Sequence, residues 1–453
     1  MDGRMRRRIP WATTRLQTSR AAGGRFVRNA QDGNGGFVAC DAVRTADRQA
    51  MADARDIVAL SEVYLPATGG HINWQHEVYK RLGNVCVLTA KMPGLPSREQ
   101  IDGVTVRRIR LSRWSILRPE SLLLYGNLAA HCLQQVLRTR PVALIAARVL
   151  PEGLVAGIIG RALGIPVFTF AHGEEVAVYG QEASFAKNST TARMKRWFLW
   201  KGYALSRTVI ANSRFTFRLL RQGGGPGRRI ELVHPGTDPA VFRPGPKSRA
   251  MMQRWNIDNG PVLLTVGALC ERKGQDTMIR AMPQILAEFP QAQYLIAGSG
   301  PKRLMLEALA SELGVRERVF FLGRVPDAEL PDLYNLADVF VMANRVLEGQ
   351  GEVEGFGIVF LEASAAGKPV IGGNTGGTED AIQEGVTGLR IDARDPATVA
   401  RAVVSILKHP ELAREFGRQG RQRVLKDFTW DRSAAGIRQL ILRYSQRPHR
   451  SRV

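Results

Sequence analysis

Short, largely apolar runs recur along most of this chain, and segments long enough to form helices separate them. The first run is Ile57 to Leu60, and later examples are Val167 to Phe170, Thr208 to Ala211 and Val262 to Val266. Runs of this length are typical of strands buried on both faces, and strands that alternate with helices form parallel sheets. The pattern therefore predicts an α/β fold built from doubly wound parallel sheets.

The series of strands and helices breaks once, at the Pro/Gly-rich segment 239–246, and then starts again. A chain of 453 residues has room for two or three domains at about 150 residues each. We therefore expect two Rossmann-like domains that face a central cleft. The expected divisions are a disordered basic leader (1–50), two α/β domains (51–240 and 241–430), a C-terminal helix that could cross back to the first domain (431–446) and a basic tail (447–453).

The composition limits the partners and the cellular setting. The formal net charge of +23 favours anionic partners, but no nucleic-acid recognition motif is visible. Cys40, Cys86, Cys132 and Cys270 form no CxxC pair, and no stretch reaches the roughly 18 apolar residues of a membrane span. We expect a cytoplasmic protein, and leave open whether it lies peripherally on the inner face of the plasma membrane.

The basic leader shows no apolar periodicity. A start codon assigned too early explains it better than a targeting signal, because the hydrophobic region of a secretory signal is missing. We expect that removing residues 1–50 would leave folding and activity nearly unchanged.

The sharpest chemical signal is the segment Glu354 to Glu362, in which seven residues separate two glutamates. Its glycines, Gly355 and Gly357, let backbone N–H groups approach a ligand closely. The apolar run that follows reads as a helix, whose N-terminus attracts phosphate. The two carboxylates lie about two helical turns apart and can reach different parts of one ligand.

In this segment the chain resembles the retaining GT-B nucleotide-sugar glycosyltransferases of glycosyl transferase group 1, or family 4. Its motifs are most similar to those of the phosphatidylinositol mannosyltransferases. The resemblance runs from about Ile57 to Tyr444 and is most specific between Gly267 and Gly388. It implies a GT-B fold in which the first domain takes the acceptor and the second the nucleotide sugar. It also implies that Glu354 binds the donor-sugar hydroxyls and Glu362 the ribose hydroxyls.

The resemblance carries over to further loops. It makes His172, Lys273 and Glu354 the catalytic residues, with Lys273 as the charge on the donor diphosphate. Many members have an arginine where this chain has Ala268, and Arg272 is the residue that could supply that charge. The remaining residues expected to bind the donor are Gly70, Gly323, Arg324, Val325, Gly355, Phe356, Gly357, Ile358, Thr375, Gly376 and Gly377.

No carboxylate pair suitable for double displacement stands out, so the resemblance implies retention by front-face attack. The protein would neutralise the leaving diphosphate without a metal or other cofactor. GDP-mannose is the first expectation for the donor and a UDP-hexose the second. The hydroxyl acceptor, whether a lipid or a cell-envelope glycan, cannot be read from the chain.

Two stretches, Arg107 to Tyr125 and Arg193 to Tyr203, are basic and aromatic. They fit two interpretations equally: a surface that binds anionic lipid, or helices that pack their aromatic side chains inward.

Three other functions stay open. A nucleotide-sugar epimerase would need no acceptor, and a basic scaffold would turn over no donor. A dinucleotide oxidoreductase is a weaker candidate, because the segment from Gly298 to Pro301 lacks the third glycine of its motif.

Overall fold

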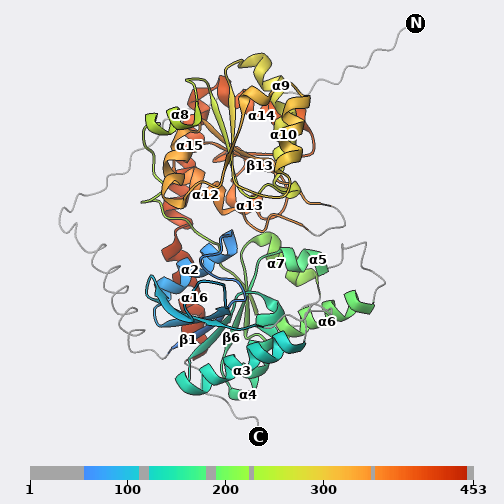
Figure 1. Cartoon of the computed structure of the whole chain (residues 1–453), viewed down its shortest axis with the longest axis vertical. Helices are drawn as coiled ribbons and strands as arrows, with labels where there is room; N and C mark the ends of the chain where they lie inside the picture. The colour runs from blue at the N-terminus through green and yellow to red at the C-terminus, as the bar shows by residue number, and fades with distance from the viewer. Residues whose placement is uncertain (1–55, 112–121, 180–189, 224–228, 348–351, 446–453) are drawn as a thin grey trace, which may run out of the picture. The chain divides into compact units, whose positions relative to one another are not determined.

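The computed structural model describes residues 56–111, 122–179, 190–223, 229–347 and 352–445, which contain two β-sheets flanked by helices (Figure 1). The predicted leader 1–50 and tail 447–453 lie outside the described residues. So do Arg113, Trp114 and Arg118 of the first basic, aromatic stretch.

The first sheet has eight strands in the order β3-β4-β2-β1-β5-β6-β7-β8. Its strands are β1 (Ile57–Leu60), β2 (Val85–Ala90), β3 (Arg98–Ile101), β4 (Val104–Ile109), β5 (Ala143–Ala146), β6 (Val167–Ala171), β7 (Thr208–Ala211) and β8 (Arg229–Leu232). The helices between them are α2 (Gly70–Leu82), α3 (Leu122–Thr139), α4 (Leu154–Leu163), α5 (Glu174–Tyr179), α6 (Thr190–Leu205) and α7 (Arg214–Gln222).

The second sheet has six strands in the order β11-β10-β9-β12-β13-β14. Its strands are β9 (Val262–Val266), β10 (Gln293–Ala297), β11 (Val319–Gly323), β12 (Val339–Met342), β13 (Val370–Gly373) and β14 (Gly388–Ile391). The helices of this half are α8 (Arg249–Trp255), α9 (Gln275–Glu288), α10 (Arg303–Glu312), α11 (Leu330–Leu336), α12 (Ile358–Ala365), α13 (Thr378–Ala381), α14 (Pro396–Lys408) and α15 (Pro410–Asp427), followed by α16 (Trp430–Ser445).

The doubly wound arrangement predicted from the sequence is confirmed. Among the described strands, neighbours pair in parallel except for β3 and β4, which are antiparallel. The antiparallel strand β3 is a departure from the expected all-parallel sheet. It is an edge strand, and its polar sequence Arg-Glu-Gln-Ile suits an edge half exposed to water.

Each sheet reverses its strand order at one point, between β1 and β5 in the first and between β9 and β12 in the second. Ligands of open α/β sheets bind beyond the carboxyl ends of the strands at such a point. The loops that follow β1, β5, β9 and β12 are therefore the places where the fold itself predicts binding residues.

Helices cover both faces of the first sheet. Neighbouring residues of a strand point to opposite faces, so they contact different helices. Ile57 and Ala59 pack with α2 and α16 in one buried cluster, whereas Val58 and Leu60 pack with α3 and α4 in another. The C-terminal helix α16 thus returns to the first sheet, where Trp74 Nε1 donates to Ser433 Oγ over 2.7 Å. None of the described helices is both long and apolar enough to span a bilayer.

Candidate active site

Glu354 lies in the loop before α12 and is the centre of a buried ion cluster. Its Oε2 accepts hydrogen bonds from Lys273 Nζ (2.5 Å) and from Arg272 Nη1 (2.9 Å). Burial alone would raise the pKa of Glu354, but the two cations hold it below its usual range. The structure therefore brings three predicted site residues into direct contact, although 81 positions separate Lys273 from Glu354.

A tight turn after β9 places the two cations. Residues Glu271–Lys273 form a short 3₁₀ turn that ends at Gly274, whose φ is +71°. A Cβ atom at Gly274 would lie 1.8 Å from the carbonyl oxygen of Ala343, so only glycine fits this approach to the chain after β12. The turn leaves Lys273 only 8% exposed and directs its amine to Glu354.

The loop from Thr375 to Gly377 packs directly on the loop that carries Glu354. The N–H of Gly377 donates to the carbonyl of Glu354 over 2.8 Å, and a Cβ atom at Gly377 would lie 2.0 Å from the carbonyl oxygen of Gly355. Gly376 has a φ of +65°. Backbone packing therefore already requires these two glycines, and their expected role in binding the donor stays a prediction.

His172 follows β6 and lies against the same loop from the first half of the chain. A Cβ atom at Gly355 would lie 2.0 Å from the His172 carbonyl oxygen, so the two backbones are in close contact. The ring Nε2 is 2.9 Å from the carbonyl of Ala147 and must donate to it, which leaves Nδ1 as an acceptor. Burial, together with the charge of Arg148, lowers the pKa of His172 to about 4. The ring is therefore neutral near pH 7.

The residues that follow Gly355 in this segment lead from the loop into α12. Phe356 is buried against the rings of His234 and Phe428, so its side chain belongs to the core. Gly357 has a φ of +88°, and α12 begins at the next residue, Ile358. A Cβ atom on Gly70, the first residue of α2, would lie 3.6 Å from Ile358 Cδ1, which places Gly70 beside the start of α12.

Glu362 lies on α12 and makes a separate contact from the ion cluster. Its Oε2 accepts a hydrogen bond from Tyr334 Oη over 2.6 Å. Burial, with a smaller contribution from the charge of Asp327, raises the pKa of Glu362 to about 7. The pKa values of the two glutamates are thus shifted in opposite directions, because two cations outweigh the burial of Glu354, whereas the hydrogen bond from Tyr334 only partly offsets the burial of Glu362.

Three of the residues expected to bind the donor lie at the end of β11 or directly after it. Gly323 closes this strand with a φ of +69°, and its carbonyl accepts the N–H of Gly298 over 2.7 Å. Arg324 is exposed, whereas Val325 packs in the buried core. A donor at this strand end would therefore contact backbone groups and the Arg324 side chain, and this role stays a prediction.

Comparison with known proteins agrees with this geometry. The family described as Glycosyl transferases group 1 matches residues 247–423, and Glycosyltransferase Family 4 matches residues 77–241. The chain is 33% identical over 334 residues to the GDP-mannose-dependent alpha-(1-6)-phosphatidylinositol monomannoside mannosyltransferase of Mycolicibacterium smegmatis, a match that covers 70% of this chain and 86% of the relative.

The chain belongs to the group 1 glycosyltransferases. It is also 31% identical to a GDP-mannose-dependent monoacylated alpha-(1-6)-phosphatidylinositol monomannoside mannosyltransferase of Corynebacterium glutamicum, over 70% of this chain and 80% of that one. Its fold resembles sucrose-phosphate synthase from Thermosynechococcus elongatus, with a TM-score of 0.71, 24% identity and coverage of 86% and 99% of the two chains. The GT-B fold and a hexosyltransferase that uses a nucleotide sugar, both predicted from the sequence, are confirmed.

Two residues of this glycosyltransferase that sequence reasoning missed lie beside His172. The His71 ring centroid is 5.5 Å from that of His172, and its Nε2 is 3.0 Å from Arg148 Nη2. Burial, His172 and Arg148 lower the pKa of His71 to about 3. Arg148 follows β5 at the strand switch point, so the rule on carboxyl ends of strands could have identified it.

A second missed group joins α13 to the first half of the glycosyltransferase. The buried carboxylate of Asp380 accepts the N–H of Arg214 and pairs with the side chains of Arg214 and His234 at 3.6 and 3.3 Å. Burial raises the pKa of Asp380, but these partners lower it overall. Nothing in the spacing of these residues along the sequence indicates that they meet.

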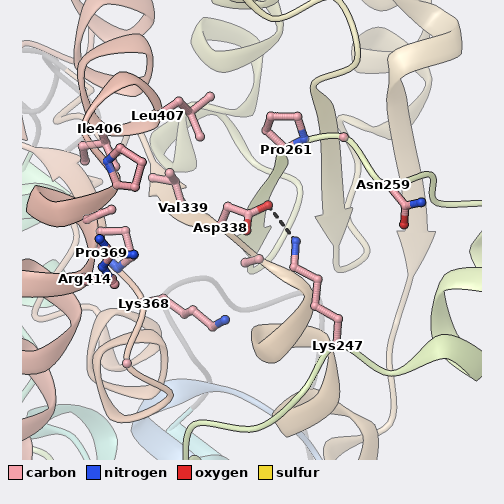
Figure 2. Close-up of a pocket in the computed structure, with 15 residues that line it drawn as sticks. Lys247, Asn259, Pro261, Asp338, Val339, Lys368, Pro369, Ile406, Leu407 and Arg414 are labelled. Atoms are coloured by element: carbon pink, nitrogen blue, oxygen red, sulfur yellow. Dashed lines mark hydrogen bonds and ion pairs between the residues drawn. The ribbon is translucent and has the colours of Figure 1, made fainter.

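A pocket of about 470 Å³ lies at the amino ends of β9, β12 and β13 (Figure 2). In it Lys247 Nζ donates to Asp338 Oδ2 over 2.8 Å, and Lys368 Nζ donates to the Asn335 carbonyl over 3.0 Å. The pocket contains none of the predicted site residues. It lies at the edge of the sheet opposite to the one where this fold binds ligands.

Proposed function

We propose that this glycosyltransferase transfers mannose from GDP-mannose to a hydroxyl acceptor, a lipid or cell-envelope glycan, with retention of the anomeric configuration. The observation that carries the proposal is the buried cluster of Glu354, Lys273 and Arg272 beside His172. Both relatives named above are GDP-mannose-dependent, which supports this donor over a UDP-hexose.

In this proposal the cluster changes partners when the donor binds. Lys273 and Arg272 face the leaving diphosphate, and Glu354 accepts hydrogen bonds from the donor-sugar hydroxyls. Cations held in a buried site stabilise developing negative charge strongly, because they need no reorganisation during the reaction. Neutral His172 adds an acceptor at Nδ1 without adding charge.

The transfer step breaks the bond from the anomeric carbon to the diphosphate oxygen and forms one to the acceptor oxygen on the same face. The acceptor proton passes to the departing diphosphate oxygen, so no carboxylate nucleophile is needed. The two cations carry the neutralisation in this scheme, and no step is assigned to a metal ion.

The first test incubates the purified protein with GDP-mannose or UDP-glucose, with and without a lipid extract of bacterial membranes. We expect acceptor-dependent consumption of GDP-mannose and an α-linked product, read from the NMR signal of the anomeric proton. Isomerised donor in the absence of acceptor would instead indicate an epimerase. Inverted product would contradict retention, and failure to turn over any donor would favour the scaffold alternative.

Nucleotide binding is expected to depend on pH through Glu362. This carboxyl has a pKa of about 7 and is largely protonated in the free enzyme below that pH, whereas the carboxylate is the stronger acceptor for hydroxyl hydrogen bonds. Binding of GDP should therefore release a proton and strengthen as pH rises, with Kd falling up to about tenfold per unit below pH 7. Calorimetry in buffers of different ionisation enthalpy measures this release.

The matched control is Glu362→Gln, which keeps the shape of the side chain and cannot titrate. It should weaken GDP binding at pH 8 and remove the additional proton release, leaving only the titration of the nucleotide phosphate. If wild type and Glu362→Gln show the same pH dependence, Glu362 does not contact the ribose hydroxyls.

A further inference from the structure

The pocket of about 470 Å³ at the amino ends of β9, β12 and β13 takes no part in the site described above (Figure 2). We call it the amino-end pocket. Its size falls within the range of about 300 to 1,000 Å³ that is typical of sites for small organic molecules. Its apolar walls come from the starts of the three strands and from α14 and α15, and comprise Pro261, Val339, Pro369, Ile406, Leu407 and Pro410. These walls suit the apolar body of a small molecule.

The cations that line the amino-end pocket outnumber its acids. Lys247, Lys368 and Arg414 line it together with one acid, Asp338, so three positive charges and one negative charge leave a net charge of +2. The carboxylate of Asp338 is already engaged, because its Oδ2 accepts Lys247 Nζ and the N–H of Val262, each over 2.8 Å. The lining therefore has positive charge to spare for an anion.

Lys368 is the cation whose charge is least compensated. Among the residues that the structure describes, it forms no ion pair with a carboxylate, and its Nζ donates to the Asn335 carbonyl over 3.0 Å. An ammonium has three donors, so this one bond does not satisfy it. Burial lowers the pKa of Lys368 to about 8, and Lys247 adds to this effect, whereas Asp338 opposes it. An anion beside the amine would favour its protonated form.

We propose that the amino-end pocket is a second ligand site, which binds the phosphate of a small phosphate monoester through Lys368 and Lys247 and packs its apolar body against the pocket walls. Such a phosphate carries a charge of about −1.5 to −2 at pH 7, which matches the net charge of the lining better than a single carboxylate does. A divalent cation is disfavoured by the same positive charge. A sugar body is disfavoured because its hydroxyls would face apolar walls.

Lys368 also connects this pocket to Glu362. Residues 367–369 join the end of α12 to β13, and Glu362 lies on α12. The carbonyl that accepts Lys368 Nζ belongs to Asn335, and the preceding residue, Tyr334, donates to Glu362 over 2.6 Å. Two bonds thus hold the end of α11 to the segment that carries Glu362. An anion that draws the amine away from Asn335 releases one of them. We therefore expect the ligand to weaken GDP binding by about fivefold or more, a step that rests on the proposed ribose contact of Glu362.

The first test measures the binding of phenyl phosphate by calorimetry to the full chain saturated with GDP, so that the active site is already occupied. We expect one equivalent to bind, and inorganic phosphate and glucose 6-phosphate to bind more weakly, because neither has an apolar body. Lys368→Gln and Lys247→Gln should each weaken binding by on the order of tenfold or more, since each removes a charged hydrogen-bond donor. The control Lys426→Gln, at an exposed position of α15, should bind like wild type.

The second test varies pH in wild type and in Lys368→Arg. The amine of Lys368 loses its proton above about pH 8, so the affinity of wild type for phenyl phosphate should fall by up to about tenfold from pH 8 to pH 9. Arginine stays protonated, so Lys368→Arg should keep its affinity. The other charged groups that line the pocket, Lys247, Asp338 and Arg414, are the same in both proteins, and the comparison therefore isolates position 368.

The coupling to the active site is measured by titrating GDP with and without phenyl phosphate. A loss of GDP affinity that persists in Lys368→Gln would show competition in the active site and would overturn the coupling. GDP binding without phenyl phosphate reports that each variant is folded. The whole proposal is overturned if Lys368→Gln binds phenyl phosphate like Lys426→Gln, or if the protein saturated with GDP binds none. Binding of phenyl phosphate by a protein that transfers no sugar would contradict the proposed function alone.

Discussion

Lys273→Ala is expected to lower kcat by on the order of a hundredfold or more while leaving the protein folded. One well-placed group that stabilises developing charge is worth roughly 3 kcal/mol in a transition state. Lys273 is buried and held 2.5 Å from Glu354, so its amine is already in position before the donor binds. Glu354 keeps Arg272 as a partner in this variant, which limits the loss of stability.

The matched control is Lys302→Ala, which removes a half-exposed lysine whose Nζ is 3.8 Å from Glu271, a residue of the same turn. Its turnover should stay near the wild-type value. Steady-state kinetics with saturating donor measure both variants. If Lys273→Ala changes only KM, this lysine binds the donor equally in the ground state and the transition state, and it does not stabilise the transition state selectively.

Glu354→Ala is expected to give the largest loss of stability among the site variants, about 3 to 5 kcal/mol in the free energy of unfolding. The substitution leaves the buried Lys273 and the partly buried Arg272 without a carboxylate, and breaking a buried pair in this way is strongly destabilising. Urea denaturation measures the effect. Glu379→Ala serves as the control, because its pair with Arg218 is half exposed and should be worth less than about 1 kcal/mol.

The conservative variant Glu354→Gln separates stability from catalysis. It should fold better than Glu354→Ala but still lose turnover, since a neutral amide holds neither the donor sugar nor Lys273 in place. The double variant Lys273→Ala, Glu354→Gln should have a kcat only a little lower than that of either single variant, because the effects of residues that act as one unit are not additive. His172→Ala should resemble Glu354→Gln, with a lower kcat. If the decrease in kcat of the double variant equals the product of the two single decreases, Lys273 and Glu354 act independently.

Local pattern in the sequence was enough to predict the buried strands. The ranges expected for β1, β7 and β9 agree with the structure to the residue, because a strand buried on both faces must be largely apolar along its length. The two edges of the first sheet, β3 and β8, escaped prediction. Both are short and carry charged residues, as exposed edges do, so they lack the apolar signal on which the prediction depended.

The sequence by itself determined the fold class and the positions of the glycine-rich loops after the strands, since apolar runs and glycine-rich turns are local properties of the chain. Only the tertiary structure decided the charges in the site. Glu354 is held ionised by two residues from a turn 81 and 82 positions away, whereas burial raises the pKa of Glu362 in the same motif to about 7. Burial and distant partners set a pKa, and neither can be read from the spacing of residues along the chain.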